Sequence, residues 1–450
     1  MAQGYFLSGK HDQVATFDYF FRKCPFKGGY VVFAGTSDFL EILKNFRFNN
    51  EELQFLKQKR FKEQFLAFLK KFKFKGTIYS AKEGEIIFPN EPVLRIEGTI
   101  LEAQIIETLL LNILNFESLI ATKASRIRQV AEDKTVLDFG LRRAQGFGGI
   151  QASKAAIIGG LDGTSNVFSG MEYDIEVSGT MAHSWIQSFD NELIAFQTYA
   201  KFYPDSCVLL VDTFDTINSG IPNAIKVAKE LEEKGHQLKA IRLDSGDLAY
   251  LSKKARKLLN DADLQYVKIA ASNQLDEHLI RSLNEQNAPI DLYGVGTKLV
   301  TAYDHPALDG VYKLSSINNK PTLKISENVE KITLPASKKI IRFLNQDGSF
   351  NCDGILLENE TNVDSILHPH FPTKKTTVTH LKSIELLSKI VDKGELINEI
   401  PSVKESAAYA KIQLSKLSAE HRRFDNPHVY KVGISSKLAE LRDELINQKH

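Results

Sequence analysis

The stretch AIRLDSGD, residues 240–247, shows most directly how this chain folds. A short apolar run ends in charged, hydroxyl and glycine residues, and a helical pattern follows it. Six further segments repeat this order: LDFGLRRAQG (137–146), GGLDGTSN (159–166), VSGTMAHSW (177–185), LLVDTFDT (209–216), IAASNQLDE (269–277) and LYGVGTKLVT (292–301). Parallel strands that alternate with helices close into a barrel, and barrel enzymes carry their chemistry at the C-terminal strand ends. The sequence therefore predicts an irregular, TIM-like α/β barrel and favours an enzyme over a binding module.

The composition limits the partners that this chain can have. Lys+Arg number 57 and Asp+Glu 56, so the formal net charge of +1 gives no general attraction to nucleic acid or anionic lipid. The three cysteines form no CxxC motif, which favours a reducing compartment. The most apolar run, LLLNILNF at 109–116, is too short for a membrane span, and the first residues lack the apolar core of a signal peptide. We expect a cytoplasmic protein that binds neither nucleic acid nor membranes.

The length of 450 residues, 43% of them hydrophobic, is enough for more than one domain. We predict an N-terminal α+β segment over 1–115, the catalytic barrel over 116–310, and a β-rich and helical segment over 311–450. The β-rich start and end of the chain are expected to pack together as a second domain.

Two local patterns outside the barrel predict particular elements. Residues 51–74 carry Phe and Leu at helical spacing among lysines, which predicts one amphipathic surface helix. After the barrel, the segments around Asn318-Asn319 and Asp347-Gly348 alternate like strands and predict two hairpins.

Arg242 and Asp244 are the first candidates for chemistry. Side chains alternate along a strand, so these two share one face while Ile241 and Leu243 share the other. The charged pair is therefore expected to point into the barrel mouth, either as a structural ion pair or as reactive groups. Asp212 and Asp215 follow a neighbouring strand, and several carboxylates in one mouth repel one another unless a cation joins them. Mg²⁺ bound with a phosphate or diphosphate would supply that charge, with these two aspartates as its ligands.

The segment LYGVGTKLVT is a candidate phosphate cradle. Gly294 and Gly296 allow backbone N–H groups to approach an anion, and a helix that starts near Lys298 would add its positive end. A short GxGT is often only a tight turn, but phosphate sites recur at the last strands of such barrels. Ser272 and Asn273, at the preceding strand end, could donate to the same phosphate.

Two further strand ends offer an anion site and a titratable group. Arg142 and Arg143 follow the first barrel strand, and a guanidinium matches a carboxylate or phosphate with two parallel hydrogen bonds. Their alternative is a solvated surface pair. His183, in SGTMAHSW, follows a Gly-Thr turn, and its largely neutral imidazole could act as a nucleophile or as a proton carrier. Spacing alone does not decide between these two roles.

Seven ordered motifs together resemble the nicotinate phosphoribosyltransferase family. They are FFRKCPFKGGYVVFAG, DFGLRRAQG, GGLDGTSN, GTMAHSW, RLDSGD, GVGTKLVTAYDHPAL and LSAEHRRFDNPHVYKV, and they run through nearly the whole chain. The resemblance implies an α/β barrel with an attached β domain and a homodimer with active sites at the subunit interface. It also implies the joining of nicotinate to phosphoribosyl pyrophosphate, coupled to ATP hydrolysis, which is the first step of NAD salvage from nicotinate.

The resemblance also implies roles for single residues. His183 matches the histidine that ATP phosphorylates in a water-poor mouth, and Arg242 and Asp244 would face the reacting ribose. Phe139 is the ring against which nicotinate would stack, while Arg22 and Lys23 match a basic pair that reaches phosphates across the dimer interface. The full set of expected substrate-binding positions is Phe139, Arg142, Arg143, Ser165, Thr180, Asp212, Asp215, Ser272, Asn273, Gly294, Gly296, Thr297, Arg22 and Lys23.

Ser165 is the expected determinant of the base. Relatives that use nicotinamide resemble Gly-Thr-Asp where this chain has Gly163-Thr164-Ser165, and a carboxylate there would repel nicotinate. The double arginine at 142–143 also favours an anionic base. A nicotinamide- or quinolinate-using relative on the same fold is the alternative enzyme.

One departure from the family lies at the first residues. Family members begin with a segment like Thr-Asp-x-Tyr-x-x-Thr-Met whose tyrosine stacks on the base in the partner's site, and this sequence starts at that Met. Either the start is placed late, or one wall of the base pocket is missing. The second case would also suit a non-catalytic, nucleotide-binding descendant.

Overall fold

A computed structural model describes residues 1–371 and 373–448, and the chain divides into two compact units. The parallel-sheet unit is Ile120–Pro306, and the β-rich unit combines Met1–Leu119 with Ala307–His450. The domain boundaries predicted from the sequence, after 115 and after 310, stay a prediction. Within the described part of the chain, no helix has the length and apolar character that a membrane crossing requires.

The parallel-sheet unit contains six strands in the order β7-β6-β11-β10-β9-β8, and every neighbouring pair is parallel. The strands are β6 Thr135–Asp138, β7 Gly163–Thr164, β8 Val208–Leu210, β9 Ala240–Leu243, β10 Lys268–Ser272 and β11 Leu292–Val295. Because all six run the same way, their carboxyl ends meet at one edge of the sheet. The prediction of an irregular α/β barrel is thereby confirmed.

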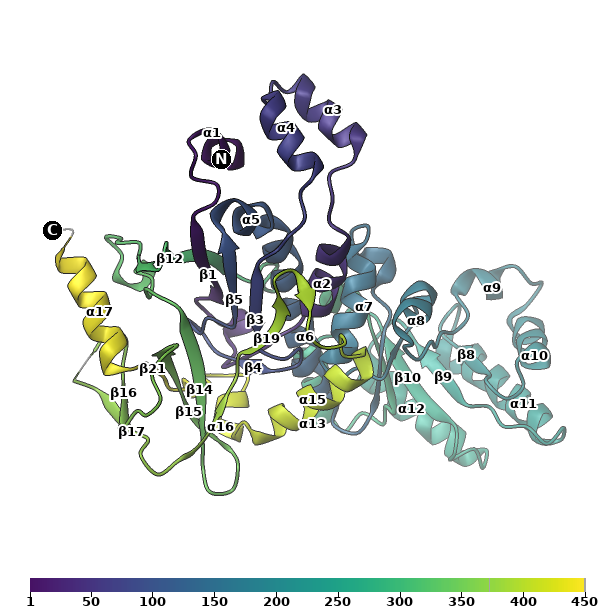
Figure 1. The fold of residues 1–450 in the computed structure, drawn as a ribbon. Coiled ribbons are helices and arrows are strands. Elements are labelled where there is room, and N and C mark those ends of the chain that lie inside the picture. The colour runs from purple at the N-terminus through teal and green to yellow at the C-terminus, as the bar shows by residue number, and fades with distance from the viewer. Residues whose placement is uncertain (372, 449–450) are drawn as a thin grey trace. The chain divides into compact units, whose positions relative to one another are not determined.

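Helices connect these strands, as the sequence pattern predicted. Figure 1 shows the strands β8, β9 and β10 with α11 and α12 beside them. The helices of this unit are α7 Gly148–Ile158, α8 Val167–Tyr173, α9 His183–Gln187, α10 Glu192–Phe202, α11 Ile221–Glu232, α12 Leu248–Asp261, α13 Glu277–Glu285 and α14 Thr297–Val300, and α6 Glu107–Ala131 leads into it.

One predicted strand is wrong. The segment before Ser178 forms only an isolated bridge, in which Val177 pairs with Thr164. Asp174 ends α8 in a left-handed conformation with φ 52°, so only residues 175–177 remain before the polar turn. The polar turn that begins at Ser178 follows directly, and the pairing is not extended beyond this bridge.

The β-rich unit holds two larger sheets that combine both ends of the chain. Their orders are β13-β12-β1-β5-β3-β19-β20 and β17-β16-β21-β15-β14-β18. The strands are β1 Val14–Phe21, β3 Thr77–Ser80, β5 Leu94–Thr99, β12 Gly310–Ile317, β13 Lys320–Pro321, β14 Lys338–Leu344, β15 Phe350–Leu357, β16 Ser365–Leu367, β17 Lys375–Thr377, β18 Lys382–Glu385, β19 Ser388–Asp392, β20 Glu395–Leu396 and β21 Val432–Ile434, with β2 Val31–Val32 and β4 Ile86–Ile87 as a separate pair. Because β1 pairs with β12 and β3 with β19, the predicted packing of N- and C-terminal segments is confirmed.

Both predicted hairpins are confirmed. Asn318 and Asn319 join β12 to β13 with φ of 49° and 60°, the left-handed pair that a two-residue hairpin requires. Asp347-Gly348 lies in the turn between β14 and β15, and Gly348 has φ 82°. The helices of this unit are α1 Ala2–Leu7, α2 Thr36–Asn45, α3 Asn50–Gln58, α4 Glu63–Lys70, α5 Ile100–Ile105, α15 Val403–Lys416, α16 Ala419–Arg422 and α17 Ser436–Asn447.

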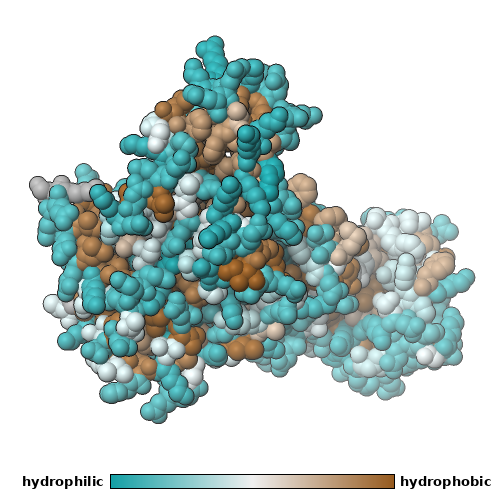
Figure 2. Space-filling view, viewed as in Figure 1, coloured by the Kyte–Doolittle hydropathy of each residue, from teal (hydrophilic) through white to brown (hydrophobic). Residues whose placement is uncertain are grey.

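The prediction of one amphipathic helix over 51–74 is wrong, because the structure has the two helices α3 and α4 there. Arg60 adopts φ 67°, which ends the first helix and turns the chain back. The turn lets Phe65 and Leu69 bury against Phe72 and Leu101. Figure 2 shows hydrophilic residues over the outer end of this hairpin and apolar residues below them.

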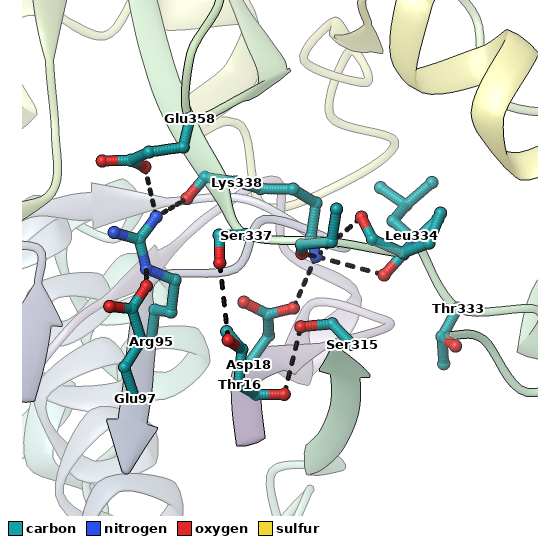
Figure 3. A network of polar contacts seen from close by, with 12 residues as sticks. Thr16, Asp18, Arg95, Glu97, Ser315, Thr333, Leu334, Ser337, Lys338 and Glu358 are labelled. Carbon is teal, nitrogen blue, oxygen red and sulfur yellow. Dashed lines mark hydrogen bonds and ion pairs between the residues drawn. The ribbon is translucent and has the colours of Figure 1, made fainter. Parts of the chain in front are cut away.

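A buried ion pair joins distant segments inside the β-rich unit (Figure 3). Lys338 Nζ lies 2.7 Å from Asp18 Oδ2, and the two side chains are 2% and 4% exposed. Burial lowers the pKa of Lys338, while Asp18 opposes that shift. The ammonium also donates to the carbonyls of Leu334 (3.1 Å) and Pro335 (3.3 Å), so its hydrogen-bonding capacity is used. The pair therefore fastens β1 to the start of β14.

Replacing Lys338 with methionine should destabilise the chain by about 3–5 kcal/mol, because Asp18 would stay buried without its cation. Urea unfolding followed by circular dichroism measures the change. Lys389→Met is the control, since Lys389 and Asp392 form an exposed pair (40% and 45%) and such pairs contribute about 0–1 kcal/mol. Equal, small effects of both substitutions would contradict this account.

Candidate active site

Arg242 lies at the centre of a polar cluster at the carboxyl edge of the parallel sheet. Its Nε donates to Ser272 Oγ (2.8 Å), one terminal nitrogen donates to Thr180 Oγ1 (2.7 Å), and the other lies 2.8 Å from Asp244 Oδ1. The Ser272 hydroxyl is also hydrogen-bonded to Asp244. One guanidinium therefore connects the ends of β9 and β10 with the segment before α9.

The predicted alternation along β9 is confirmed. Ile241 and Leu243 are 0% exposed, whereas the side chains of Arg242 and Asp244 keep 16% and 25% of their surface. The pair is thus held firmly from one side and open to a ligand from the other.

The carboxylates that follow the strands do not gather into one group. Asp212 Oδ2 accepts from the Asp244 N–H (2.8 Å) and from Ser245 Oγ (2.6 Å), so it lies beside the pair. Asp215 instead caps the helical turn Thr216–Gly220, and the N–H and side-chain amide of Asn218 lower the pKa of its carboxyl. Asp247 caps α12.

No three His, Cys, Asp or Glu side chains of residues 1–371 and 373–448 are arranged to hold a metal ion. Among the described residues of this cluster, Arg242 is the cation nearest to Asp244. The Asp212 Oδ1 atom is buried and has no hydrogen-bond partner, which leaves it as an oxygen that a cation could use.

His183 stands beside the same cluster as the first residue of α9. Its Nδ1 lies 3.0 Å from Thr213 Oγ1, and its Nε2 lies 3.8 Å from Asp244 Oδ2. The side chain is 40% exposed, so the imidazole is more open to water than the predicted water-poor mouth. Thr213 was not among the predicted site residues, although its position between the two candidates Asp212 and Asp215 could have indicated it.

The Phe139 ring forms the other wall of the cluster. The Arg242 guanidinium carbon lies 5.4 Å from the ring centroid, within cation–π range. The ring covers Gly294 so closely that an added Cβ there would come 2.4 Å from Phe139 Cε2. Gly294 therefore makes room for an aromatic ring, in addition to its predicted part in a phosphate cradle.

The predicted phosphate cradle consists of two adjoining loops. Gly296 precedes the short helix α14, which starts at Thr297, and Asn273 is exposed with φ 85°. Lys298 Nζ lies 2.5 Å from Asp276 Oδ2 and so ties the loop after β11 to the loop after β10. Burial raises the pKa of Asp276, but the hydrogen bonds from Lys298 and Leu279 outweigh it and lower the pKa.

The remaining predicted residues lie on other segments of the chain. Arg142 and Arg143 are exposed in the turn Leu141–Arg143, and Ser165 lies at the end of β7, where its N–H donates to Asp138 O (2.8 Å). Arg22 and Lys23 follow β1 in the β-rich unit, where the Arg22 guanidinium lies 5.5 Å from the Phe20 ring centroid. Their predicted reach to a partner's phosphates stays a prediction.

Comparison with known proteins identifies the family of this chain. Three family descriptions match the chain: the nicotinate phosphoribosyltransferase N-terminal domain over residues 1–115, the family itself over 135–355, and the C-terminal domain over 337–442. The nicotinate phosphoribosyltransferase of Bacillus subtilis (strain 168) is 45% identical over 446 residues, which cover 97% of this chain and 91% of that protein. The Homo sapiens protein of the same name is 33% identical, with 99% and 94% covered.

Solved structures give the same result. The crystal structure of human nicotinic acid phosphoribosyltransferase matches with a TM-score of 0.90 at 31% identity, covering 99% of this chain and 98% of that one. A nicotinate-nucleotide pyrophosphorylase from Pyrococcus furiosus, at 24% identity and a TM-score of 0.71, supports the fold alone. The chain belongs to the nicotinate phosphoribosyltransferase family, as the sequence motifs had indicated.

Gly294→Ala should destabilise the parallel-sheet unit by about 1–3 kcal/mol, because the added methyl forces the Phe139 ring out of its place. Thermal unfolding measures this loss. Gly4→Ala is the matched control, since no atom lies within 4 Å of an added Cβ at that helical position. If both variants unfold like wild type, the Phe139 ring is not held against Gly294.

Proposed function

We propose that this chain joins nicotinate to phosphoribosyl pyrophosphate, giving nicotinate mononucleotide and pyrophosphate, with ATP hydrolysis coupled to the step. The relatives' names support the substrate class. The observation that carries the proposal is the arrangement of Asp244, Arg242 and Phe139 at one strand edge. A carboxylate, a cation and an aromatic wall there can serve the ribose, the leaving group and the base.

Asp244 and Arg242 would act on the sugar. The ring nitrogen of nicotinate donates its lone pair to C1 of the ribose while the bond from C1 to the diphosphate oxygen breaks, and the diphosphate leaves with that electron pair. C1 gains positive charge on the way, and a fixed carboxylate stabilises it. Because Arg242 and Ser272 hold Asp244 from one side, the carboxylate needs little reorganisation when this charge develops.

The base would lie against the Phe139 ring. Stacking on an aromatic face contributes about 1–3 kcal/mol per base. Arg142 and Arg143 are close in sequence, exposed and free to close over an anionic base. Ser165 carries no charge, so it would not repel a nicotinate carboxylate as an aspartate would.

The phosphates would bind at Gly296 and Thr297, with Asn273 from the neighbouring loop. Mg²⁺ that arrives with the diphosphate would neutralise part of its charge. Asp212 fits such an ion better than Asp215, because Asp212 Oδ1 has no partner whereas both Asp215 oxygens accept hydrogen bonds in its cap.

His183 would carry the coupling to ATP. A ring nitrogen attacks the γ-phosphorus, ADP leaves, and water later releases the phosphate from the histidine. Nδ1 is hydrogen-bonded to Thr213 Oγ1 at 3.0 Å, whereas Nε2 lies 3.8 Å from Asp244 Oδ2, so Nε2 is the nitrogen proposed to react. Thr180, bound to Arg242, links this segment to the sugar site.

We further propose a cytoplasmic homodimer with shared sites, and exposed apolar side chains support the dimer. In the loop after β6 and on α8, Phe147, Val167 and Met171 are 83%, 70% and 73% exposed. Such a group of exposed apolar residues is typical of an interface. A second copy would cover them and bring its own Arg22 and Lys23 to the phosphates.

Product formation tests the proposed reaction. The purified chain should convert nicotinate and phosphoribosyl pyrophosphate to nicotinate mononucleotide faster with ATP than without it, as measured by chromatography. Nicotinamide and quinolinate, tried separately, should be poor substrates. A preference for either of them would replace the proposed base, and no product with any base would indicate the non-catalytic alternative.

His183→Ala should abolish the stimulation by ATP but leave slow, ATP-independent transfer, because the sugar site stays intact. Wild type incubated with γ-labelled ATP should carry acid-labile phosphate, and the variant should carry none. His236→Ala is the control, since His236 is paired with Asp205 at the surface of the same unit. Equal labelling of the His183 variant and wild type would rule out this histidine as the acceptor.

A further inference from the structure

A buried carboxylate directly precedes Phe139 in the chain. Asp138, the last residue of β6, is 2% exposed. One oxygen accepts from the Gly140 N–H (2.8 Å), and the other accepts from Ser153 Oγ (2.7 Å) and Thr164 Oγ1 (2.8 Å). These donors come from three segments: the turn after β6, helix α7 and strand β7.

The carboxylate has no ion-pair partner among residues 1–371 and 373–448. Burial raises the pKa of Asp138, and only the three hydrogen bonds oppose that shift. A buried charge without a cation is costly, so its three donors must all stay in place for it to be tolerated. The network is therefore rigid: moving any one of the three segments would leave part of the carboxylate unsatisfied.

The same network extends to the neighbouring buried polar groups. Thr164 Oγ1 accepts from the Asn166 N–H (3.0 Å), and the Asn166 side chain donates to Ser153 Oγ (3.3 Å) and caps α8. The Asp138 carbonyl accepts from the Ser165 N–H (2.8 Å) and from Ser165 Oγ (3.2 Å). Asp138 therefore binds the turn after β6, α7 and β7 through its side chain, and Ser165 through its carbonyl.

Two groups proposed to touch the base depend on this residue. Phe139 is the next residue in the chain, and its ring direction is set by the turn that the Gly140 N–H closes onto Asp138. Ser165 is held by the Asp138 carbonyl. The two loops of the predicted phosphate cradle are joined separately, by the Lys298–Asp276 ion pair.

We infer that Asp138 is a positioning residue for the base, which sets the distance between the Phe139 wall and Ser165 without touching substrate. This inference rests on the proposed function. It predicts that damage to the network weakens binding of nicotinate much more than binding of phosphoribosyl pyrophosphate.

Asp138→Leu removes both acceptor oxygens, and with them all three hydrogen bonds to the side chain, while it keeps the same number of side-chain heavy atoms. Its Kd for nicotinate, measured by isothermal titration without the other substrates, should rise about ten-fold or more, since losing an aromatic stack on a base weakens binding to that degree. The KM for phosphoribosyl pyrophosphate should change little. Asp138→Asn keeps an acceptor for the Gly140 N–H and should restore part of the nicotinate affinity. Thr164→Val, which removes one donor, should give an intermediate value and serves if the leucine variant does not fold.

Glu360→Leu is the matched control. Glu360 is 6% exposed and accepts from the Leu357 N–H (2.7 Å) and Ser435 Oγ (2.6 Å) in the β-rich unit. It should lower the melting temperature and leave nicotinate affinity unchanged. Wild type that does not bind nicotinate overturns the proposed function together with this inference. Wild-type affinity in folded Asp138 variants, or an equal loss for both substrates, overturns the role of Asp138 alone.

Discussion

The Arg242 guanidinium is the interaction on which the candidate site depends. Its three contacts, to Ser272, Thr180 and Asp244, join segments that are separated by up to 92 residues in the chain, from 180 to 272. A planar guanidinium has donors in fixed directions, so these partners can be satisfied together only in one arrangement. The position of Asp244, and with it the neighbours of Asp212 and His183, follows from that arrangement.

The parallel sheet decides which residues can join this arrangement. Strands β9 and β10 pair in parallel with Arg242 beside Ala270, so the next residues of both strands reach the same edge. Asp244 and Ser272 then meet although neither pattern alone shows the contact. Phe139 enters from β6 and lies over Gly294 of the adjacent strand, which closes the cluster on its other side.

Sequence reasoning succeeded where a structural feature depends on residues that are close together in the chain. Period-two alternation was enough to place Arg242 and Asp244 on the open face, and Asn318-Asn319 was enough for a hairpin. The prediction of one helix over 51–74 failed at Arg60. The left-handed conformation there depends on the packing of Phe65 and Leu69, which the spacing of apolar residues in the sequence does not show. Asp212 and Asp215 looked alike after one strand, but only the three-dimensional structure shows that the second caps a helical turn. Asp138 was missed because its side chain binds Ser153 and Thr164, which only the fold brings to it.

The central claim is that Asp244 presents a negative charge, fixed by Arg242 and Ser272, to the ribose carbon as pyrophosphate leaves. The turnover number of Asp244→Asn tests it most directly, because the substitution keeps shape and removes charge. Loss of one preorganised electrostatic partner costs roughly 3 kcal/mol, so turnover should fall by about 10²-fold or more while the melting temperature stays near that of wild type. Turnover close to wild type in a folded variant would show that the Arg242–Asp244 pair only supports the fold.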